Sequence, residues 1–246
     1  MKRIIDFVFS FLGLLFCSPI LVPVIFLVWI QDWHSPFYIA LRVGKNEKLF
    51  KMVKLRSMIM NADKSGVDST SSNDKRITSV GRFIRRYKMD ELTQLWNVLR
   101  GDMSLVGPRP NVKRETDLYT NEEKKLLLVK PGITDFSSIV FSDEGDILKD
   151  QIDPDIAYNQ LIRPGKSILG IFYIEHRNLA IDFKLIYLTI LAILSKEKAL
   201  MAVCEALKNL GANEELVKLA SRKYVLIPTP PPGAKNIVTN REGRVE

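Results

Sequence analysis

The 246-residue sequence has few of the residues that hold small domains together through covalent bonds or metal ions. Its two cysteines, Cys17 and Cys204, are far apart in the chain, which argues against a disulfide framework. Its two histidines, His34 and His176, do not stand at the spacing of metal ligands. A zinc site built from histidine and cysteine is therefore excluded. A hard cation held by carboxylate and phosphate oxygens stays open.

Acidic residues are also in deficit. There are 28 aspartates and glutamates against 36 lysines and arginines, which gives a formal net charge of +8. Such an excess suits a nucleic acid, an anionic membrane face or a phosphate-rich substrate. The length is sufficient for one ordinary domain with attachments.

Charge is missing altogether from Phe7 to Ile30. As a straight helix this run would be about 36 Å long, against a hydrocarbon core of about 30 Å, so hydropathy predicts a transmembrane helix. A cleaved signal peptide is disfavoured, because residues 31–34 lack a small-residue cleavage site.

Two features of this run argue against a plain span. Ser18-Pro19 and Pro23 fall in its middle, where proline removes backbone hydrogen bonds and kinks a helix. Basic residues stand on both flanks: Lys2, Arg3, Arg42, Lys45 and Lys48. Both ends then favour the cytoplasmic side, and a helix broken at Ser18-Pro19 that enters and leaves the same leaflet satisfies this. The Ser18 hydroxyl is a partner for one freed backbone group. From the residues alone, re-entrant and spanning placements both stay open.

Several shorter patterns predict the elements that follow. Runs of β-forming residues at 38–43 and 49–55, separated by 44–47, predict a hairpin. The polar, serine-rich segment 62–74 predicts a mobile loop. Thr120 and Glu123 have capping-box spacing, so a helix should begin there. Residues 183–194 predict an apolar helix, either in the core or on a membrane surface.

The remaining patterns lie toward the C-terminus. The acidic cluster at 143–146 fits no complete EF-hand loop, so a solvated acidic turn is favoured over calcium binding. Residues 197–210 and 213–221 predict two short helices around Gly211. The proline-rich tail that begins at Pro228 is expected to be extended or disordered.

The most informative stretch runs from Asp74 to Pro110. Its adjacent carboxylates Asp90 and Glu91 precede an apolar stripe at i, i+3, i+4 and i+7, formed by Leu92, Leu95, Trp96 and Leu99. This spacing predicts an amphipathic helix that ends at Gly101, with both carboxylates in its first turn. Carboxylates at such a position often only cap the helix.

The surroundings of the carboxylate pair favour an anion site instead. Four cations precede it within a short span: Arg82, Arg85, Arg86 and Lys88. Arg109 follows in a Gly-Pro-Arg-Pro turn.

This stretch resembles the signature of the bacterial sugar transferases, which are small monotopic polyprenyl-phosphate phosphoglycosyl transferases. The family motif reads Asp-Glu-Leu-Pro-Gln-Leu-x-Asn-Val-Leu and then Gly-Asp-Met-Ser-Leu-Val-Gly-Pro-Arg-Pro; here Thr93 replaces the proline. Residues 54–58 and 130–134 match two further family elements. The segment 135–138 departs from the family pattern, so the sugar-recognising groups expected there are not carried over.

The resemblance implies an α+β, mostly helical fold. It comprises a re-entrant membrane helix at 1–36 broken at Ser18-Pro19, a β-hairpin and interfacial amphipathic helices around a compact cytoplasmic catalytic core at 37–196, and a helical appendage with a proline-rich tail at 197–246. The implied location is the cytoplasmic face of the bacterial inner membrane. The implied partners are a UDP-sugar, polyprenyl (undecaprenyl) phosphate and membrane lipid; homo-oligomerisation stays open, as do the sugar and the glycoconjugate pathway.

The resemblance also implies roles for individual residues. Asp90 is expected to be the nucleophile that forms a phosphosugar-aspartyl intermediate and to hold Mg²⁺, with Glu91 as the base. Substrate and phosphate binding is expected from Lys54, Arg56, Arg85, Arg109 and Asp182.

Two other function classes are compatible with parts of the sequence. One is a membrane-tethered, non-catalytic scaffold in polysaccharide assembly. Thr93 and the altered segment after Thr134 are departures from the family pattern that leave this alternative open. Nucleic-acid binding through the cluster at 82–88 is disfavoured, because the cluster is short and follows a predicted membrane anchor.

Overall fold

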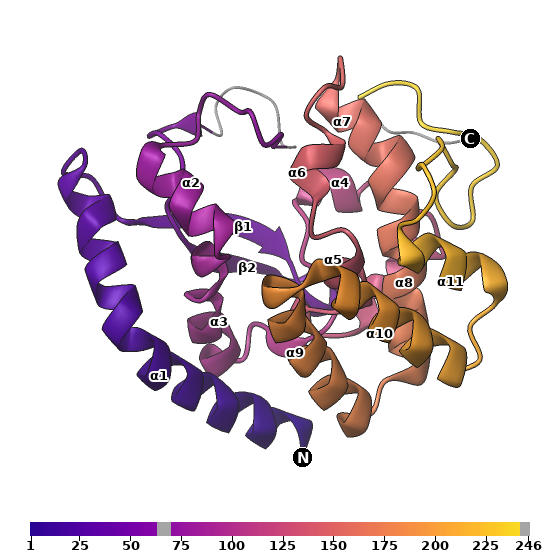
Figure 1. Cartoon of the computed structure of the whole chain (residues 1–246), viewed down its shortest axis with the longest axis horizontal. Coiled ribbons are helices and arrows are strands. Elements are labelled where there is room, and N and C mark those ends of the chain that lie inside the picture. Colours follow the sequence, from indigo (N-terminus) through magenta and orange to yellow (C-terminus); the bar gives the residue numbers. More distant parts are fainter. Residues whose placement is uncertain (63–69, 242–246) are drawn as a thin grey trace.

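The computed structural model describes residues 1–62 and 70–241 and is mostly helical, with two small sheets (Figure 1). The N-terminal part consists of α1 (Lys2–Ile30), β1 (Phe37–Val43), β2 (Leu49–Leu55), α2 (Ser79–Arg86), α3 (Gln94–Arg100) and β3 (Ser104–Val106). The middle part consists of α4 (Lys113–Thr116), β4 (Gly132–Thr134), α5 (Phe136–Val140), α6 (Glu144–Ile147) and α7 (Pro154–Ala157). The last part consists of α8 (Arg163–His176), α9 (Leu179–Leu194), α10 (Lys196–Asn209) and α11 (Glu214–Ser221). The α+β, mostly helical class is thereby confirmed; most of the predicted mobile loop at 62–74 lies outside the described residues.

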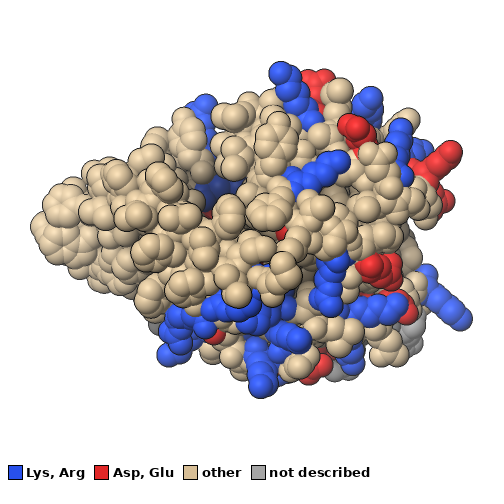
Figure 2. All heavy atoms as spheres, turned by 90° about the horizontal axis from the view of Figure 1, so that it is seen from below, with Lys and Arg blue, Asp and Glu red and all other residues tan. Residues whose placement is uncertain are grey.

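Helix α1 is continuous from Lys2 to Ile30, so the predicted interruption at Ser18-Pro19 is a bend within one helix (Figure 1). Pro19 lacks the N–H that would bond the carbonyl of Leu15, and the Ser18 hydroxyl donates to that carbonyl at 2.7 Å. By length and composition α1 is able to cross a membrane, and 17% of its most apolar window is buried. Figure 2 shows that the part of α1 projecting at the left carries no charged side chain on the face seen.

The N-terminal end of α1 is attached to the rest of the molecule by charged groups. Lys2 Nζ lies 2.5 Å from Asp182 on α9. Arg3 donates to the carbonyls of Val98 and Leu99 in the last turn of α3, at 2.6 Å for Leu99. A cation at this place stabilises the negative end of the helix dipole.

The C-terminal end of α1 is attached to the same body. Asp32, just after the helix, receives two hydrogen bonds from Arg56, which follows β2; the bond from Nη2 to Oδ1 is 2.6 Å long. The Arg56 side chain is buried and also donates to the carbonyl of Ser35 at 2.8 Å. Both ends of the apolar helix are therefore fixed on one domain.

The predicted hairpin is confirmed. Strands β1 and β2 are antiparallel, with Phe37 opposite Leu55 and Val43 opposite Leu49. A parallel pair, β3 with β4, brings Ser104 next to Gly132 and was not predicted. Three-residue strands of this kind carry too little periodicity to be found in a sequence.

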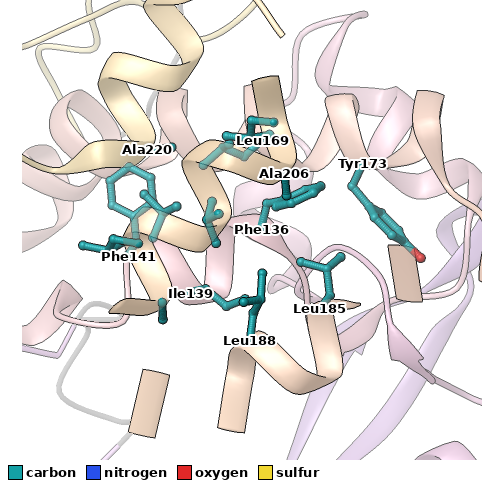
Figure 3. Close-up of a cluster of buried hydrophobic side chains, with 14 of the residues drawn as sticks. Phe136, Ile139, Phe141, Leu169, Tyr173, Leu185, Leu188, Ala206 and Ala220 are labelled. Carbon is teal, nitrogen blue, oxygen red and sulfur yellow. The ribbon is translucent and has the colours of Figure 1, made fainter. Parts of the chain in front are cut away.

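The main hydrophobic core lies between α5, α8, α9, α10 and α11 (Figure 3). Phe136 and Ile139 of α5 pack there with Leu185 of α9 and Ala206 of α10. One face of α9 is thus buried, whereas Phe183, Tyr187, Ile190 and Leu194 are exposed on it. The core expectation therefore holds for one face of α9, and the expectation that the other face lies on a membrane surface stays a prediction.

The predicted helices at 197–210 and 213–221 correspond to α10 and α11. The tail after them has neither helix nor strand, as expected, but its described part is packed rather than disordered. Thr120 donates to the carbonyl of Pro232 at 2.5 Å, and Gln160 to that of Val238 at 2.6 Å. Val238 is fully buried. The disorder expectation is therefore wrong for residues 228–241.

Candidate active site

Four charged side chains from three segments meet at one place. Lys54 comes from β2, Asp90 and Glu91 from a 3₁₀ turn (Met89–Glu91), and Arg109 from the turn after β3. Lys54 Nζ lies 3.8 Å from Asp90 Oδ2, and Arg109 Nη2 lies 2.5 Å from Glu91 Oε1. The structure thus brings together four of the residues that the sequence singled out.

The local structure around the carboxylates differs from the prediction. Asp90 and Glu91 precede α3 in their own 3₁₀ turn instead of forming its first turn. The face that α3 buries consists of Gln94, Asn97 and Val98, with Thr93 just before the helix. Trp96 of the predicted apolar stripe is 51% exposed. The prediction of an apolar buried face was wrong here because α3 packs partly on the strand β2. The polar backbone groups of that strand are bonded by polar side chains of the α3 segment.

Polar side chains join this segment to β2. Asn97 accepts from the N–H of Val53 at 2.9 Å and donates to the carbonyl of Lys51 at 2.7 Å. Thr93 Oγ1 donates to the carbonyls of Val53 at 3.1 Å and Asp90 at 3.2 Å. These bonds attach the segment that contains Asp90 to the strand that contains Lys54, because Lys51 and Val53 belong to that strand.

The two carboxylates are in different electrostatic states. Burial raises the pKa of Asp90, and the charge of Lys54 only partly opposes this. Burial acts on Glu91 too, but the charge of Arg109, followed by that of Lys54, outweighs it and lowers the pKa of Glu91 to about 2. Glu91 is held as a carboxylate, whereas Asp90 carries a charge that its surroundings stabilise poorly.

Burial also dominates the behaviour of Lys54. It lowers the pKa of the Lys54 ammonium to about 8, with repulsion from Arg109 adding to the effect and Asp90 opposing it. A phosphate group arriving at this site would favour the charged ammonium.

Arg85, another predicted residue, lies at the edge of the cluster on α2. Burial lowers its pKa, and the charge of Asp90 opposes this. Its Nε donates to Ser57 Oγ at 2.9 Å. Helix α2 lies close to the backbone just after β2 at Gly81, where a Cβ would stand 1.8 Å from the carbonyl oxygen of Ser57. Glycine is therefore required for Arg85 to reach its place.

Two predicted substrate-binding residues are engaged elsewhere. Arg56 directs its guanidinium to Asp32 and to the backbone after α1. Asp182 accepts hydrogen bonds from Lys2 and, at 2.6 Å, from Tyr173. Through Asp32 and Lys2, respectively, these two residues join the ends of α1 to the rest of the molecule.

Sequence reasoning missed two residues near the cluster. Glu144, at the start of α6, pairs with Lys166 on α8. Burial opposes its ionisation, but the charges of Lys166, Arg109 and Lys54 together lower its pKa. Its neighbour Asp143 lies 2.6 Å from Lys196 and 3.3 Å from Arg222. The expected solvated acidic turn is therefore wrong for Asp143 and Glu144, which are paired, and holds for Asp146, which is exposed. No local pattern reveals this, since the partners are distant in the chain.

The side chains at the site include few groups that could hold a magnesium ion. Within residues 1–62 and 70–241, no group of three or more His, Cys, Asp or Glu side chains is placed to hold a metal. Asp90 has Lys54 as its ion-pair partner at 3.8 Å, a distance longer than a hydrogen bond. One such carboxylate suits Mg²⁺, which is commonly held by one or two carboxylates together with substrate phosphates.

Comparison with known proteins places these residues in context. A family profile described as "Bacterial sugar transferase" matches residues 1–196. This range includes the whole charged cluster and ends where α10 begins.

Individual relatives agree with the profile. A Bacillus subtilis protein named "Putative undecaprenyl-phosphate N-acetylgalactosaminyl 1-phosphate transferase" is 43% identical over 49% of this chain and 68% of its own length. The Salmonella typhimurium "Undecaprenyl-phosphate galactose phosphotransferase" is 41% identical over 54% of this chain and 31% of its own. The Komagataeibacter xylinus "Undecaprenyl-phosphate glucose phosphotransferase" is 35% identical over 77% of this chain and 35% of its own. The chain thus spans about a third of the latter two relatives, and the three names carry three different sugars.

Proposed function

The chain belongs to the bacterial sugar transferase family, and from this premise we propose that it transfers a phosphosugar from a UDP-sugar to polyprenyl (undecaprenyl) phosphate, with release of UMP. The observation that carries the proposal is the position of Asp90, a largely buried carboxylate among cations, for which residues 1–62 and 70–241 supply an ion pair but no hydrogen bond to its side chain. A poorly stabilised carboxylate is a suitable nucleophile.

The reaction proceeds in two displacements. A carboxylate oxygen of Asp90 attacks the phosphorus that bears the sugar, and the bond from that phosphorus to UMP breaks, so that UMP leaves with the bonding electron pair. The phosphate oxygen of the polyprenyl acceptor then attacks the same phosphorus. The bond to Asp90 breaks, which regenerates the carboxylate and yields polyprenyl diphosphate sugar.

Lys54 and Arg109 bind the phosphate under attack and offset its charge, Arg109 as a planar fork. Glu91 serves as proton acceptor for the incoming phosphate. With a pKa of about 2 it is a weak base while Arg109 is bound to it. Transfer of Arg109 to the substrate phosphate would raise that pKa and ready Glu91 for its role. Mg²⁺, held by Asp90 and the diphosphate, would neutralise further charge when bound.

The attachment of α1 supports a re-entrant placement on the cytoplasmic face of the inner membrane. Both ends of the helix are bonded to one domain, through Arg3 and through Asp32. Ile4→Cys and Trp33→Cys, each in a Cys17→Ser and Cys204→Ser background, should be labelled by an impermeant maleimide from the same side of oriented vesicles. Labelling from opposite sides would establish a spanning helix.

The function itself is tested by a screen of UDP-sugars with polyprenyl phosphate, read out as UMP release. One or a few sugars should give UMP. In addition, donor alone should add the mass of a phosphosugar to the peptide that contains residues 89–100. A protein that releases no UMP with any donor would be a scaffold, not a transferase.

A further inference from the structure

A hollow lined in part by Arg109 has no role in the steps above. Its lining includes Arg109, Asp135, Ser137, Tyr158, Arg163 and Lys166. It lies between α5, α8 and the turn after β3, and α8 is on the side of the molecule opposite α1 (Figure 1). Its position away from the apolar helix suits a water-soluble donor better than a lipid.

Most charged groups of the hollow are committed to the fold. Asp135 caps α5, with its carboxylate accepting from Ser137 and from the N–H of Ser138 at 2.8 Å. Arg163 is buried against Glu123, which it contacts at 2.6 Å and 2.9 Å. Two cations remain, Arg109 and Lys166.

Lys166 has capacity for a ligand. Among the described residues Glu144 is the acceptor of its hydrogen bond, and its ammonium lies 5.3 Å from the centre of the Tyr158 ring. An ammonium has three N–H donors, so two are available. Arg109 likewise uses one nitrogen for Glu91. Glu144, set among Lys166, Arg109 and Lys54, marks a place where the site accommodates negative charge.

Building on the proposed function, we propose that Lys166 is a catalytic residue that binds the phosphate of the departing UMP. Lys54 and Arg109 hold the phosphorus under attack, Arg109 bridges to the second phosphate, and Lys166 neutralises the charge that develops on it as the bond to the sugar phosphate breaks. Glu144 holds Lys166 in place in the free protein and competes with the phosphate for it.

UMP is a suitable probe, because it contains the second phosphate and is independent of the donor sugar. Binding of UMP with Mg²⁺ to the full-length protein is measured by calorimetry, and its inhibition constant is measured in the UMP-release assay. Lys166→Ala should weaken UMP binding about tenfold or more, as expected for a lost hydrogen bond to a charged group. Lys166→Arg should recover much of the affinity, and the KM for polyprenyl phosphate should not change.

Glu144→Gln separates ligand binding from a structural role. Removal of the competing carboxylate should tighten UMP binding, the opposite sign to Lys166→Ala. If both variants weakened UMP binding equally, the pair would be structural and the inference wrong. Lys198→Ala, an exposed lysine on α10, is the matched control and should bind UMP as the unmodified protein does.

The outcomes distinguish the two proposals. A protein that releases UMP from a donor but binds UMP equally well after Lys166→Ala would overturn the inference and leave the proposed function standing. A protein that neither binds nor releases UMP would overturn both. Melting curves of Lys166→Ala and Lys166→Arg establish that each variant is folded before binding is compared.

Discussion

Two carboxylates, the fully buried Glu123 and the largely buried Asp90, are surrounded very differently. Glu123 accepts four hydrogen bonds: two from Arg163, one from Ser167 at 2.8 Å and one from the N–H of Thr120 at 3.1 Å. Asp90 has one cation at 3.8 Å. A charge with every lone pair engaged stabilises the fold, whereas a charge left with few partners is available for chemistry. On the proposed function, this contrast separates an acid that stabilises the fold from the acid that reacts.

The largest effect is expected from a substitution of Asp90, the less stabilised of the two carboxylates. Asp90→Asn should reduce UMP release by at least about a thousandfold and abolish the covalent adduct, because an amide is not a nucleophile toward phosphorus. Its thermal midpoint should not fall, since a poorly stabilised charge is removed. Turnover near that of the unmodified protein would disprove the nucleophile assignment.

The next effect concerns the structural side. Glu123→Gln leaves the buried Arg163 without its counter-charge and should cost about 3–5 kcal/mol of unfolding free energy. Urea denaturation followed by circular dichroism measures it, with Glu122→Gln on the adjacent exposed residue as the control. The adduct should still form where the variant is folded. If the urea midpoint did not change, the hydrogen bonds of Glu123 would not stabilise the fold, and the contrast with Asp90 would be contradicted.

A pH series sharpens the comparison at Lys54. Its pKa of about 8 in the folded protein is below the ordinary 10.5, so the unfolded chain binds more protons between these values. Stability contributed by this group is therefore lowest below pH 8 and rises toward pH 10.5. Activity should move the opposite way, falling severalfold above pH 8 as the phosphate-binding charge is lost. In Lys54→Arg the alkaline loss in kcat/KM should disappear, because arginine stays charged.

The smallest effect is expected at Thr93, where the family motif has proline. Its φ of −68° already suits proline. Thr93→Pro would lose the hydroxyl bonds to Val53 and Asp90 but would restrict the unfolded chain, so unfolding free energy should change by about 1 kcal/mol or less. UMP release should be maintained. A large loss of activity would mean that the Thr93 hydroxyl positions the nucleophile.

Motifs and periodicity were sufficient for some elements and not for others. The hairpin and the two C-terminal helices follow from local propensity, which acts over a few residues. Thr120 and Glu123 do exchange the bonds of a capping box, at 3.1 Å each, but the segment after them is a 3₁₀ helix. Burial of Glu123 against Arg163 there depends on residues forty positions apart, which local patterns do not encode.

The site shows the same division. The cluster of Asp90, Glu91, Lys54 and Arg109 was anticipated because a long motif contains three of its members and a second, shorter family element contains Lys54. Glu144 and Lys166 were not anticipated as site residues, because their meeting depends on how α6 packs on α8. Arg56 resembles a phosphate-binding residue in sequence, yet its partner is Asp32, a residue that hydropathy treats only as the end of an apolar run.

The double attachment of α1 has a mechanical consequence. Arg3 donates a hydrogen bond to the last turn of α3, and the 3₁₀ turn that contains Asp90 and Glu91 lies just before the first turn of the same helix. A force applied along the apolar helix, whether from lipid compression or from a fused partner, would be transmitted to Asp90 through the short helix α3. On the proposed function, a change in the depth of this helix in a membrane would therefore shift Asp90 without any ligand being involved.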